Sequence, residues 1–334
     1  MQNHNILFYL ISLVVLYSII FFANHLKISQ LIDLYDKPNK RKKHLYSVPI
    51  TGGLGLMILI IFSFIFFEIQ NFFFISKEKY FEIIIFSFSI FFIGIIDDKY
   101  ELNPKKKLLF SSLVYLIFLN YNQQFLVKEI SFSWTNHTIT LGSFSFLFTL
   151  LCFVAYLQIA NMFDGANLQC SLYSIALFLI FYSILKNIFF LILVLYLIVF
   201  SYWNFKNKSF LGDGGNYLIS FFVSLSFVQI HNNYYLNADH IFYLILFPTL
   251  DLIRLFFLRI KSKKSPFSPD RNHIHHYLLK KYNYKNVLSG YILFLFLLYI
   301  FIYFRNLYFF QWIIIIFIMF YFFLLILSNN YVKK

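Results

Sequence analysis

The chain has 334 residues, of which 60% are hydrophobic and 23% aromatic, and its formal net charge is +14. A soluble domain is roughly half apolar, whereas here the apolar residues gather in runs of about 15–20, the length of a membrane span, which excludes an ordinary soluble protein. In such a chain the positive charge is typical of cytoplasmic loops facing anionic lipid rather than of nucleic-acid binding, and two cysteines are too few for a disulfide framework.

Eleven apolar segments are predicted to cross the membrane as helices. The first lacks the basic start and the small-residue cleavage site of a secretory signal, so we interpret it as a span. The seventh is short, so ten spans remain an alternative. The predicted spans are 6–23, 49–67, 80–96, 108–121, 144–160, 168–185, 188–203, 217–230, 240–258, 286–304 and 309–328. The expected fold is an all-α polytopic transmembrane protein, with residues 1–334 as a single integral membrane domain.

The distribution of Lys and Arg predicts which way the helices run. Every second inter-span segment, starting with 24–48, belongs to one set, and this set with the C-terminal tail holds 22 of the 28 Lys and Arg residues. The opposite set holds five. Because cytoplasmic loops are enriched in these residues, the first set is predicted to be cytoplasmic and the N-terminus periplasmic. Segment 122–143 is the largest external one, and its alternating apolar residues predict a small hairpin.

Five cytoplasmic loops each carry a polar cluster, which is costly beside a membrane and therefore suggests function. The first loop has a basic run ending at His44, followed by Pro-Ile-Thr-Gly-Gly. It suits phosphate neutralisation, and a simple basic anchor is the alternative. The second places Asp97 and Asp98 at the end of one span and Lys107 at the start of the next. These carboxylates suit a divalent cation or proton handling near a phosphate, and a solvated, salt-bridged turn is the alternative.

The third and fourth loops carry isolated acidic residues among glycines and asparagines. Asn161, Asp164 and Asn167 are spaced by three, so on a helical segment they share one face. A cap and turn between two spans is the alternative. The fourth loop reads Phe-Leu-Gly-Asp-Gly-Gly-Asn, in which the glycines leave room for a metal at Asp213. Phe210 offers a flat surface for a base, and a plain turn explains the pattern equally well.

The fifth loop reads Ser-Pro-Phe-Ser-Pro-Asp-Arg-Asn-His-Ile-His-His. Its basic and imidazole side chains suit anion binding or transition-metal ligation: Arg271, His273, His275 and His276. A structural zinc site takes about four nitrogen or sulfur ligands, and no cysteine is near in sequence, so phosphate binding is preferred over zinc, with a solvated loop as the alternative. Asp251 and Arg254, one turn apart in the ninth span, are predicted to pair with each other or with this loop.

In order and spacing, these five clusters resemble those of the polyprenyl-phosphate N-acetylhexosamine-1-phosphate transferases, a family of glycosyltransferase family 4 type. The resemblance runs from about Asp36 to His276, and the fifth cluster looks like the bacterial undecaprenyl-phosphate GlcNAc-1-phosphate transferase branch. It implies that a HexNAc-1-phosphate passes from a UDP-sugar to undecaprenyl phosphate, with release of UMP, as the initiating step of cell-surface polysaccharide synthesis. It also implies Mg²⁺, with Mn²⁺ as the alternative, and a bacterial inner-membrane enzyme whose active site faces the cytoplasm.

The same resemblance implies roles for individual residues. Asp213 matches the main Mg²⁺ ligand, and Asn161 matches a second ligand. Asp97 matches a residue proposed to deprotonate or position the lipid phosphate, Asp98 would orient the metal or Lys107, and Asp164 belongs to the same catalytic group. Phe210 matches a residue that stacks on uracil. The other substrate-binding residues that it implies are His44, Lys107, Asn167, Arg271, His273, His275 and His276.

The third cluster departs from the bacterial family pattern, which is usually Asp-Gly-x-Asp-Gly-Leu. Here Asn167 stands for the second Asp and Leu168 for the following Gly. Eukaryotic members also carry Asn at this place, so Asn is compatible with activity, whereas loss of the Gly bears on the uridine contacts. Asn216 stands where Ser is usual.

Two other functions remain as alternatives: a transporter or flippase of a lipid-linked sugar, and a catalytically silent relative. Transporters place polar residues near the bilayer midplane, whereas here the acidic residues cluster at one face and only Asp251 and Arg254 fall within a span. The expected partners are therefore a UDP-sugar, undecaprenyl phosphate and the lipid bilayer. Nucleic acid is not expected, and a homodimer is left open.

Overall fold

A computed structural model describes residues 2–38, 46–66, 77–135, 137–265, 272–305 and 310–329. Over these residues the chain forms twelve α-helices and two short two-stranded sheets. Eleven helices coincide with the predicted spans, which confirms the all-α fold, and the twelfth, α10 (Ile274–Lys281), lies in the loop after the ninth span. The long helices are α1 (Gln2–Ile32), α2 (Gly52–Phe66), α3 (Lys77–Tyr100), α4 (Pro104–Tyr121), α5 (Ser145–Phe163), α6 (Gln169–Leu185), α7 (Ile188–Phe205), α8 (Gly212–Asn232), α9 (Ala238–Lys261), α11 (Tyr284–Phe304) and α12 (Phe310–Asn329).

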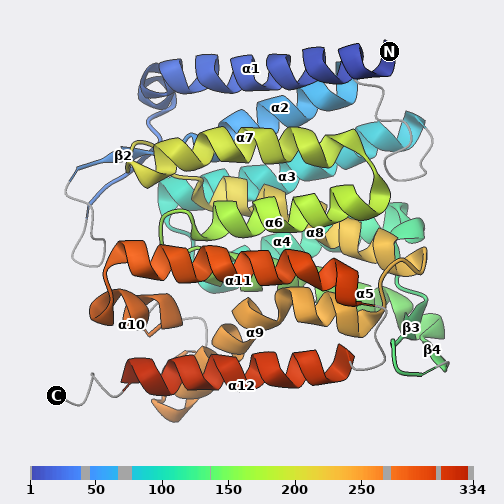
Figure 1. The fold of residues 1–334 in the computed structure, drawn as a ribbon. Helices are drawn as coiled ribbons and strands as arrows, with labels where there is room; N and C mark the ends of the chain where they lie inside the picture. Colours follow the sequence, from blue (N-terminus) through green and yellow to red (C-terminus); the bar gives the residue numbers. More distant parts are fainter. Residues whose placement is uncertain are drawn as a thin grey trace.

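Length and apolar composition make most of these helices suited to a bilayer. Among the described residues, α1, α3, α5, α7 and α9 are each long and apolar enough to cross a membrane, and α2, α6, α11 and α12 contain shorter apolar stretches. Because all of them lie side by side (Figure 1), the molecule is a multi-pass membrane protein.

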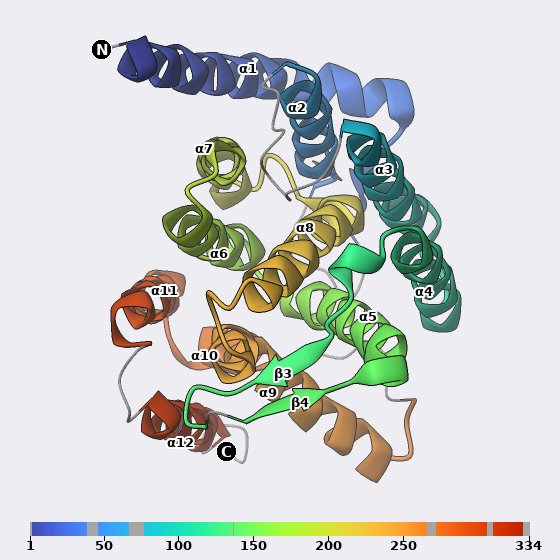
Figure 2. The same cartoon turned by 90° about the vertical axis from the view of Figure 1, so that its right-hand side faces the viewer.

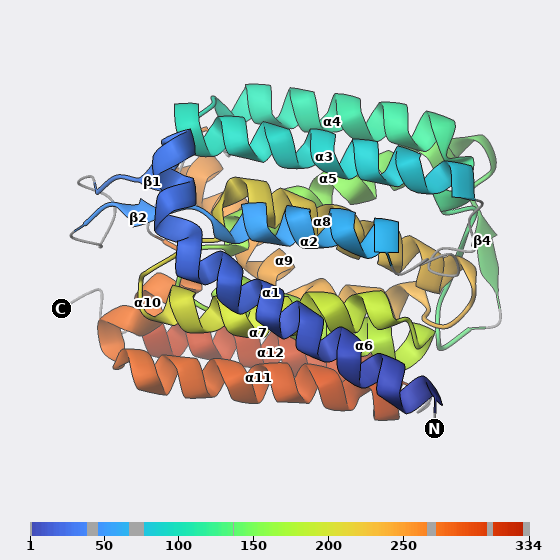
Figure 3. The same ribbon diagram turned by 90° about the horizontal axis from the view of Figure 1, so that it is seen from above.

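The helices run between two chemically different ends of the bundle (Figures 1 and 3). At one end lie β1 (Tyr35–Asp36), β2 (Val48–Pro49), α10 and the last turn of α12. The described parts of segments 33–51, 101–103, 164–168, 206–211 and 262–283 join helices there, and we call this the motif end because all five polar loops reach it. At the other end, β3 (Glu129–Ser131) pairs antiparallel with β4 (Thr138–Thr140). This confirms the predicted hairpin.

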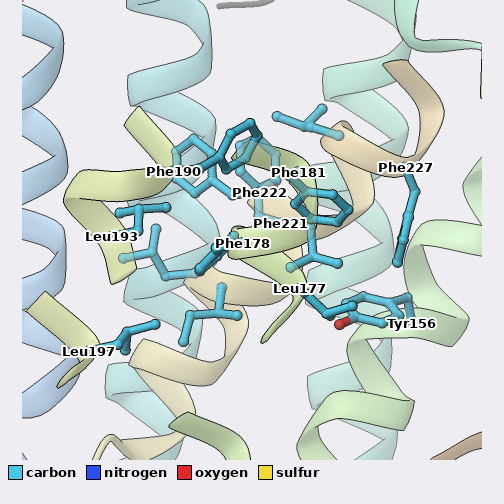
Figure 4. Close-up of a cluster of buried hydrophobic side chains, with 14 of the residues drawn as sticks. Tyr156, Leu177, Phe178, Phe181, Phe190, Leu193, Leu197, Phe221, Phe222 and Phe227 are labelled. Atoms are coloured by element: carbon cyan, nitrogen blue, oxygen red, sulfur yellow. The ribbon is translucent and has the colours of Figure 1, made fainter. Parts of the chain in front are cut away.

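Helix α8 forms the centre of the molecule (Figure 2). Its residues from Gly214 to His231 are buried on every side, as expected for a helix enclosed by others. Helices α2, α3, α5 and α6 all contact it. On one side, aromatic rings of α6, α7 and α8 interlock: Phe181 meets Phe190 at 5.4 Å and Phe227 at 5.2 Å between ring centroids (Figure 4). The aromatic contacts therefore pack the part of α8 that is remote from the motif end.

Two pairs of glycines bring α2 and α3 onto the first turn of α8. A Cβ atom on Gly94 would overlap the backbone of Gly214, and one on Gly53 would overlap the backbone of Gly215. Small residues allow membrane helices to approach this closely. The acidic pair of α3 lies one turn beyond Gly94. The close packing of α3 against α8 therefore places that pair beside the first turn of α8.

Candidate active site

Three helix ends meet in a cluster of charged side chains at the motif end. Asp97 and Asp98 lie in the last turn of α3, Lys107 in the first turn of α4 and Asp213 in the first turn of α8. The Lys107 ammonium forms an ion pair with Asp97 and lies 3.4 Å from Oδ2 of Asp213. The backbone N–H of Leu102 donates to Oδ1 of Asp97 at 2.8 Å. The structure thus brings together four residues that were predicted to act together.

Asp98 contacts the backbone of α8. The N–H groups of Asp213 and Gly214 donate to its two carboxylate oxygens at 2.8 and 3.1 Å. The first N–H groups of a helix have no partner within the helix, so a carboxylate from α3 caps α8 and favours its positive end. Of the two adjacent carboxylates, Asp97 makes the ion pair with Lys107. The predicted role of Asp98 in orienting a metal or Lys107 stays a prediction.

The cluster is buried on one side and open on the other. Asp97 is 3% exposed, whereas the side chains of Lys107 and Asp213 are 22% and 28% exposed. Lys107 precedes the apolar part of α4; burial alone would lower the pKa of its ammonium, but the charges of Asp213 and Asp97 outweigh that effect and hold the pKa above its ordinary value. A charged amine and a carboxylate therefore lie together at the accessible edge.

The donor set of this cluster fits Mg²⁺ in kind, because it consists of carboxylate oxygens. In the described ranges, however, no group of three or more His, Cys, Asp or Glu side chains is already arranged around a metal position. Lys107 instead bridges Asp97 and Asp213. Since Mg²⁺ often takes only one or two protein carboxylates and completes its shell with water and substrate phosphates, the exposed edge of Asp213 fits such a partial site.

The third loop is attached to the start of α8 through Asn216. Its amide donates to the carbonyl of Ala160 at 3.1 Å, and the Cys170 thiol lies 3.6 Å from its Oδ1. The end of α5, with Asn161 and Asp164, therefore lies beside the first turn of α8. Among the described residues no hydrogen bond or ion pair joins either of them to Asp213, so the predicted second metal ligand at Asn161 stays a prediction.

The departure at Leu168 has a conformational explanation. Its φ is +68°, in the left-handed region that glycine adopts freely and other residues rarely do. Its N–H donates to Oδ1 of Asn204 at 2.7 Å, and the amide of Asn204 donates to the carbonyl of Ser209 at 3.1 Å. Asn167 donates to Asn207 at 2.6 Å. One buried asparagine of α7 thus ties the third loop to the fourth.

The first and fourth loops are joined backbone to backbone. Phe210 donates its N–H to Pro49 at 2.9 Å and accepts from the N–H of Gly52 at 3.0 Å. Thr51 and Ser209 share a hydroxyl hydrogen bond of 3.0 Å. The ring of Phe210 is half-buried. These bonds fix Phe210 at the motif end, where its predicted stacking on uracil remains to be tested.

Asp251 organises the fifth loop. One of its oxygens accepts from Arg254 at 2.6 Å and from the hydroxyl of Tyr321 at 3.1 Å, and the other lies 3.0 Å from Nδ1 of His273. The predicted pairing of Asp251 with Arg254 and with this loop is therefore confirmed. His275 lies against Gly165, where a Cβ would overlap its imidazole, so the fifth loop reaches the third.

The profile of glycosyl transferase family 4 matches residues 80–231, the segment from α3 to α8 that holds the charged cluster. Three bacterial relatives share the name undecaprenyl-phosphate alpha-N-acetylglucosaminyl 1-phosphate transferase. That of Yersinia pestis is 26% identical over 280 residues, which cover 79% of this chain and 74% of the relative. The Escherichia coli K12 protein is 24% identical (78% and 72% covered), and the Thermotoga maritima protein is 27% identical (75% and 74% covered).

The charged cluster thus lies in the part of the chain that is similar to glycosyl transferase family 4. The site includes residues that the sequence patterns did not single out as functional, above all Asn204 and Cys170. Their only sequence signal was a polar residue at the end of an apolar run. Of the predicted site residues, the histidines His273, His275 and His276 lie at the start of α10, with the rings of His275 and His276 4.2 Å apart. His44 and Arg271 lie outside the described residues.

Proposed function

We propose that this protein transfers a HexNAc-1-phosphate, from UDP-GlcNAc or a related UDP-amino sugar, to undecaprenyl phosphate. The observation that carries the proposal is the meeting of Asp97, Lys107 and Asp213 at the ends of three helices, next to two further polar loops. The names of the bacterial relatives support the same reaction. An oxygen of the lipid phosphate attacks the β-phosphorus, the bond to the UMP oxygen breaks, and UMP and undecaprenyl-diphospho-sugar are the products.

The residues of the site suit this reaction because phosphoryl transfer depends mainly on positioning and charge neutralisation. Lys107 supplies a positive charge at the accessible edge of the cluster. Asp97 is buried and held by both Lys107 and the Leu102 N–H, so it has one orientation in which to position or deprotonate the lipid phosphate. Phe210 would stack on uracil, and the histidines of α10 would hold the diphosphate or the sugar.

Mg²⁺, with Mn²⁺ as the alternative, would be held by Asp213 and Asn161 and would neutralise charge on the diphosphate. Asp98 then acts indirectly, by capping α8 and fixing the direction of Asp213. We place this site at the cytoplasmic face of a bacterial inner membrane, because the motif end carries most of the Lys and Arg residues. Such a reaction would begin the synthesis of a cell-surface polysaccharide.

The proposal is tested by release of UMP from purified protein supplied with undecaprenyl phosphate, Mg²⁺ and a panel of UDP-HexNAc donors. We expect UMP and a lipid-linked sugar from at least one donor, loss of activity with EDTA, and recovery with added Mg²⁺. Asp213→Asn should lower the rate by roughly 100-fold or more, since a charged group at the reacting centre is removed. If no donor gave UMP, the enzyme proposal would be wrong. If Asp213→Asn kept full activity, the assignment of Asp213 as a metal ligand would be wrong.

A further inference from the structure

A peptide group of the third loop is held at both of its polar atoms. The carbonyl of Asn167 accepts from the hydroxyl of Tyr284, at the start of α11, at 3.1 Å. The N–H of Leu168, on the other side of the same peptide bond, donates to Oδ1 of Asn204 at 2.7 Å. Side chains of two helices, α11 and α7, therefore fix the direction of this peptide group between them.

Packing places the Tyr284 hydroxyl against the loop. The Tyr284 ring lies 6.2 Å, between centroids, from that of Phe205, the last residue of α7. Two turns further along α11, Tyr291 donates its hydroxyl to the carbonyl of Gln169 at 2.7 Å, and its ring lies 6.3 Å from that of Phe163. Helix α11 is thus attached to the start of α6, and Tyr284 stays beside the loop as long as these contacts hold.

The direction of the peptide group decides whether Leu168 is strained. The φ of Leu168 is +68°, a conformation that is costly for an L-residue with a side chain. Rotating the Asn167–Leu168 peptide by half a turn would carry that φ to negative values, which are freely allowed. The same rotation would turn the carbonyl away from Tyr284 and the N–H away from Asn204. The two hydrogen bonds therefore hold the loop in a conformation that leucine by itself disfavours.

We propose that Tyr284 is a positioning residue for UDP-sugar binding, because it holds the Asn167–Leu168 peptide in the direction that the bound donor requires. The inference rests on the proposed function and on the predicted role of Asn167 in binding the substrate. It adds a residue outside the segment 80–231 that the family profile matches. When only part of a population has the binding conformation, the apparent affinity falls in proportion. Loss of the Tyr284 hydroxyl should therefore weaken donor binding without changing the reacting groups.

Tyr284→Phe tests the inference, since it removes the hydroxyl and keeps the ring. We expect the KM for the UDP-sugar to rise about fivefold, which corresponds to about 1 kcal/mol, while kcat and the KM for undecaprenyl phosphate stay close to wild type. Tyr17→Phe is the matched control. Tyr17 is also half-buried and donates its hydroxyl to the carbonyl of Gly55 at 2.9 Å, and it joins α1 to α2 on the opposite side of α8 from α11 (Figure 2). An unchanged donor KM in Tyr284→Phe, or an equal rise in Tyr17→Phe, would overturn the inference.

A second change, at Leu168, separates this role from simple packing. Glycine adopts a positive φ without cost, so Leu168→Gly in the Tyr284→Phe background should bring the donor KM back toward the wild-type value. The Tm should fall at the same time, because the buried Leu168 side chain is lost. If the Tyr284 hydroxyl only stabilised the bundle, the second change would worsen both the donor KM and the Tm. A donor KM that does not recover would contradict the inference.

Hydrogen exchange gives a readout that does not depend on turnover. The Leu168 N–H should exchange faster in Tyr284→Phe than in wild type or Tyr17→Phe, because the released peptide can turn its N–H away from Asn204. Equal exchange in all three proteins would refute the inference. Wild-type protein that releases no UMP from any donor would contradict the proposed function, whereas faster exchange in Tyr284→Phe would still establish that this hydroxyl holds the loop.

Discussion

At Leu168, a residue with a side chain occupies a backbone conformation that favours glycine. The left-handed conformation costs an L-residue roughly 1–2 kcal/mol, and Leu168 adopts it with a φ of +68°. Its side chain is buried and its N–H is bonded to Asn204, so packing and one hydrogen bond offset the cost. The departure from the family pattern therefore keeps the turn that the usual glycine would make.

Asn204 is expected to stabilise this turn. In Asn204→Ala, the Leu168 N–H and the Ser209 carbonyl both lose their partner, and a buried polar group left without a hydrogen bond costs about 1–3 kcal/mol. We expect a lower Tm in detergent together with slower UMP release. Lys206→Ala, an exposed change nearby, serves as the control: its free energy of unfolding should stay within about 0.5 kcal/mol of wild type, so its Tm should hardly change. Equal Tm values for the two variants would show that Asn204 does not stabilise the turn.

For single residues, the sequence predicts well which of them belong to the same site. It predicts less well which of their atoms are in contact. Asp97, Asp98 and Asp213 could be assigned to one site because three apolar runs end beside them. Which of the adjacent carboxylates meets Lys107 depends on the rotation of α3 about its axis, and packing against α8 sets that rotation. Asn204 was not predicted because both of its partners are backbone groups, which leave no mark in the side-chain pattern, and one of them lies 36 residues away.

Among the elements, the contact of α3 with α8 decides the geometry of the site. Gly94 and Gly214 permit it, and the cap that Asp98 places on α8 depends on it. The same contact explains an error in the predicted boundary. The apolar run ends at Ile96, whereas α3 continues to Tyr100, because the two aspartates have partners and need not leave the helix.

Gly94→Ala should separate the two helices. The new Cβ would overlap the Gly214 backbone, and overpacking of this kind costs roughly 1–3 kcal/mol. We expect a lower Tm and a loss of UMP release larger than the loss of folded protein, because the Asp98 cap shifts with α3. Ile85→Ala is the control on the same helix, since the Ile85 side chain is 59% exposed and faces away from the site. A Gly94→Ala protein with wild-type Tm and rate would show that this close approach is unimportant.

The bundle as a whole has its polar loops at one end and its hairpin at the other (Figure 1). The position of all five polar loops at one end could be predicted, because consecutive antiparallel spans place every second loop at the same face of the membrane. The central place of α8 could not, since the apolar and small polar residues of α8 form no separate faces that would indicate which helices surround it. The short helix α10 was also missed, because it has only eight residues and four of them are His or Lys.

The orientation in the membrane is predicted by charge and can be tested directly. Alkaline phosphatase, which is active only outside the cytoplasm, should be active when inserted at Trp134 between β3 and β4. Green fluorescent protein should fluoresce when inserted after Ser262, and phosphatase placed there should be inactive. The opposite pattern would put the N-terminus and the hairpin in the cytoplasm and the charged cluster outside.

The capping of α8 by Asp98 also constrains the order in which the protein is completed during synthesis. Asp97 and Asp98 leave the ribosome more than a hundred residues before Gly212, so for that interval Asp98 lacks the N–H donors that it later binds. Seven helices are therefore made before their central partner exists. A chain that stops before α8 would leave Asp98 without the two N–H donors that it binds in the complete protein, so we expect such a chain to be a target of membrane quality control.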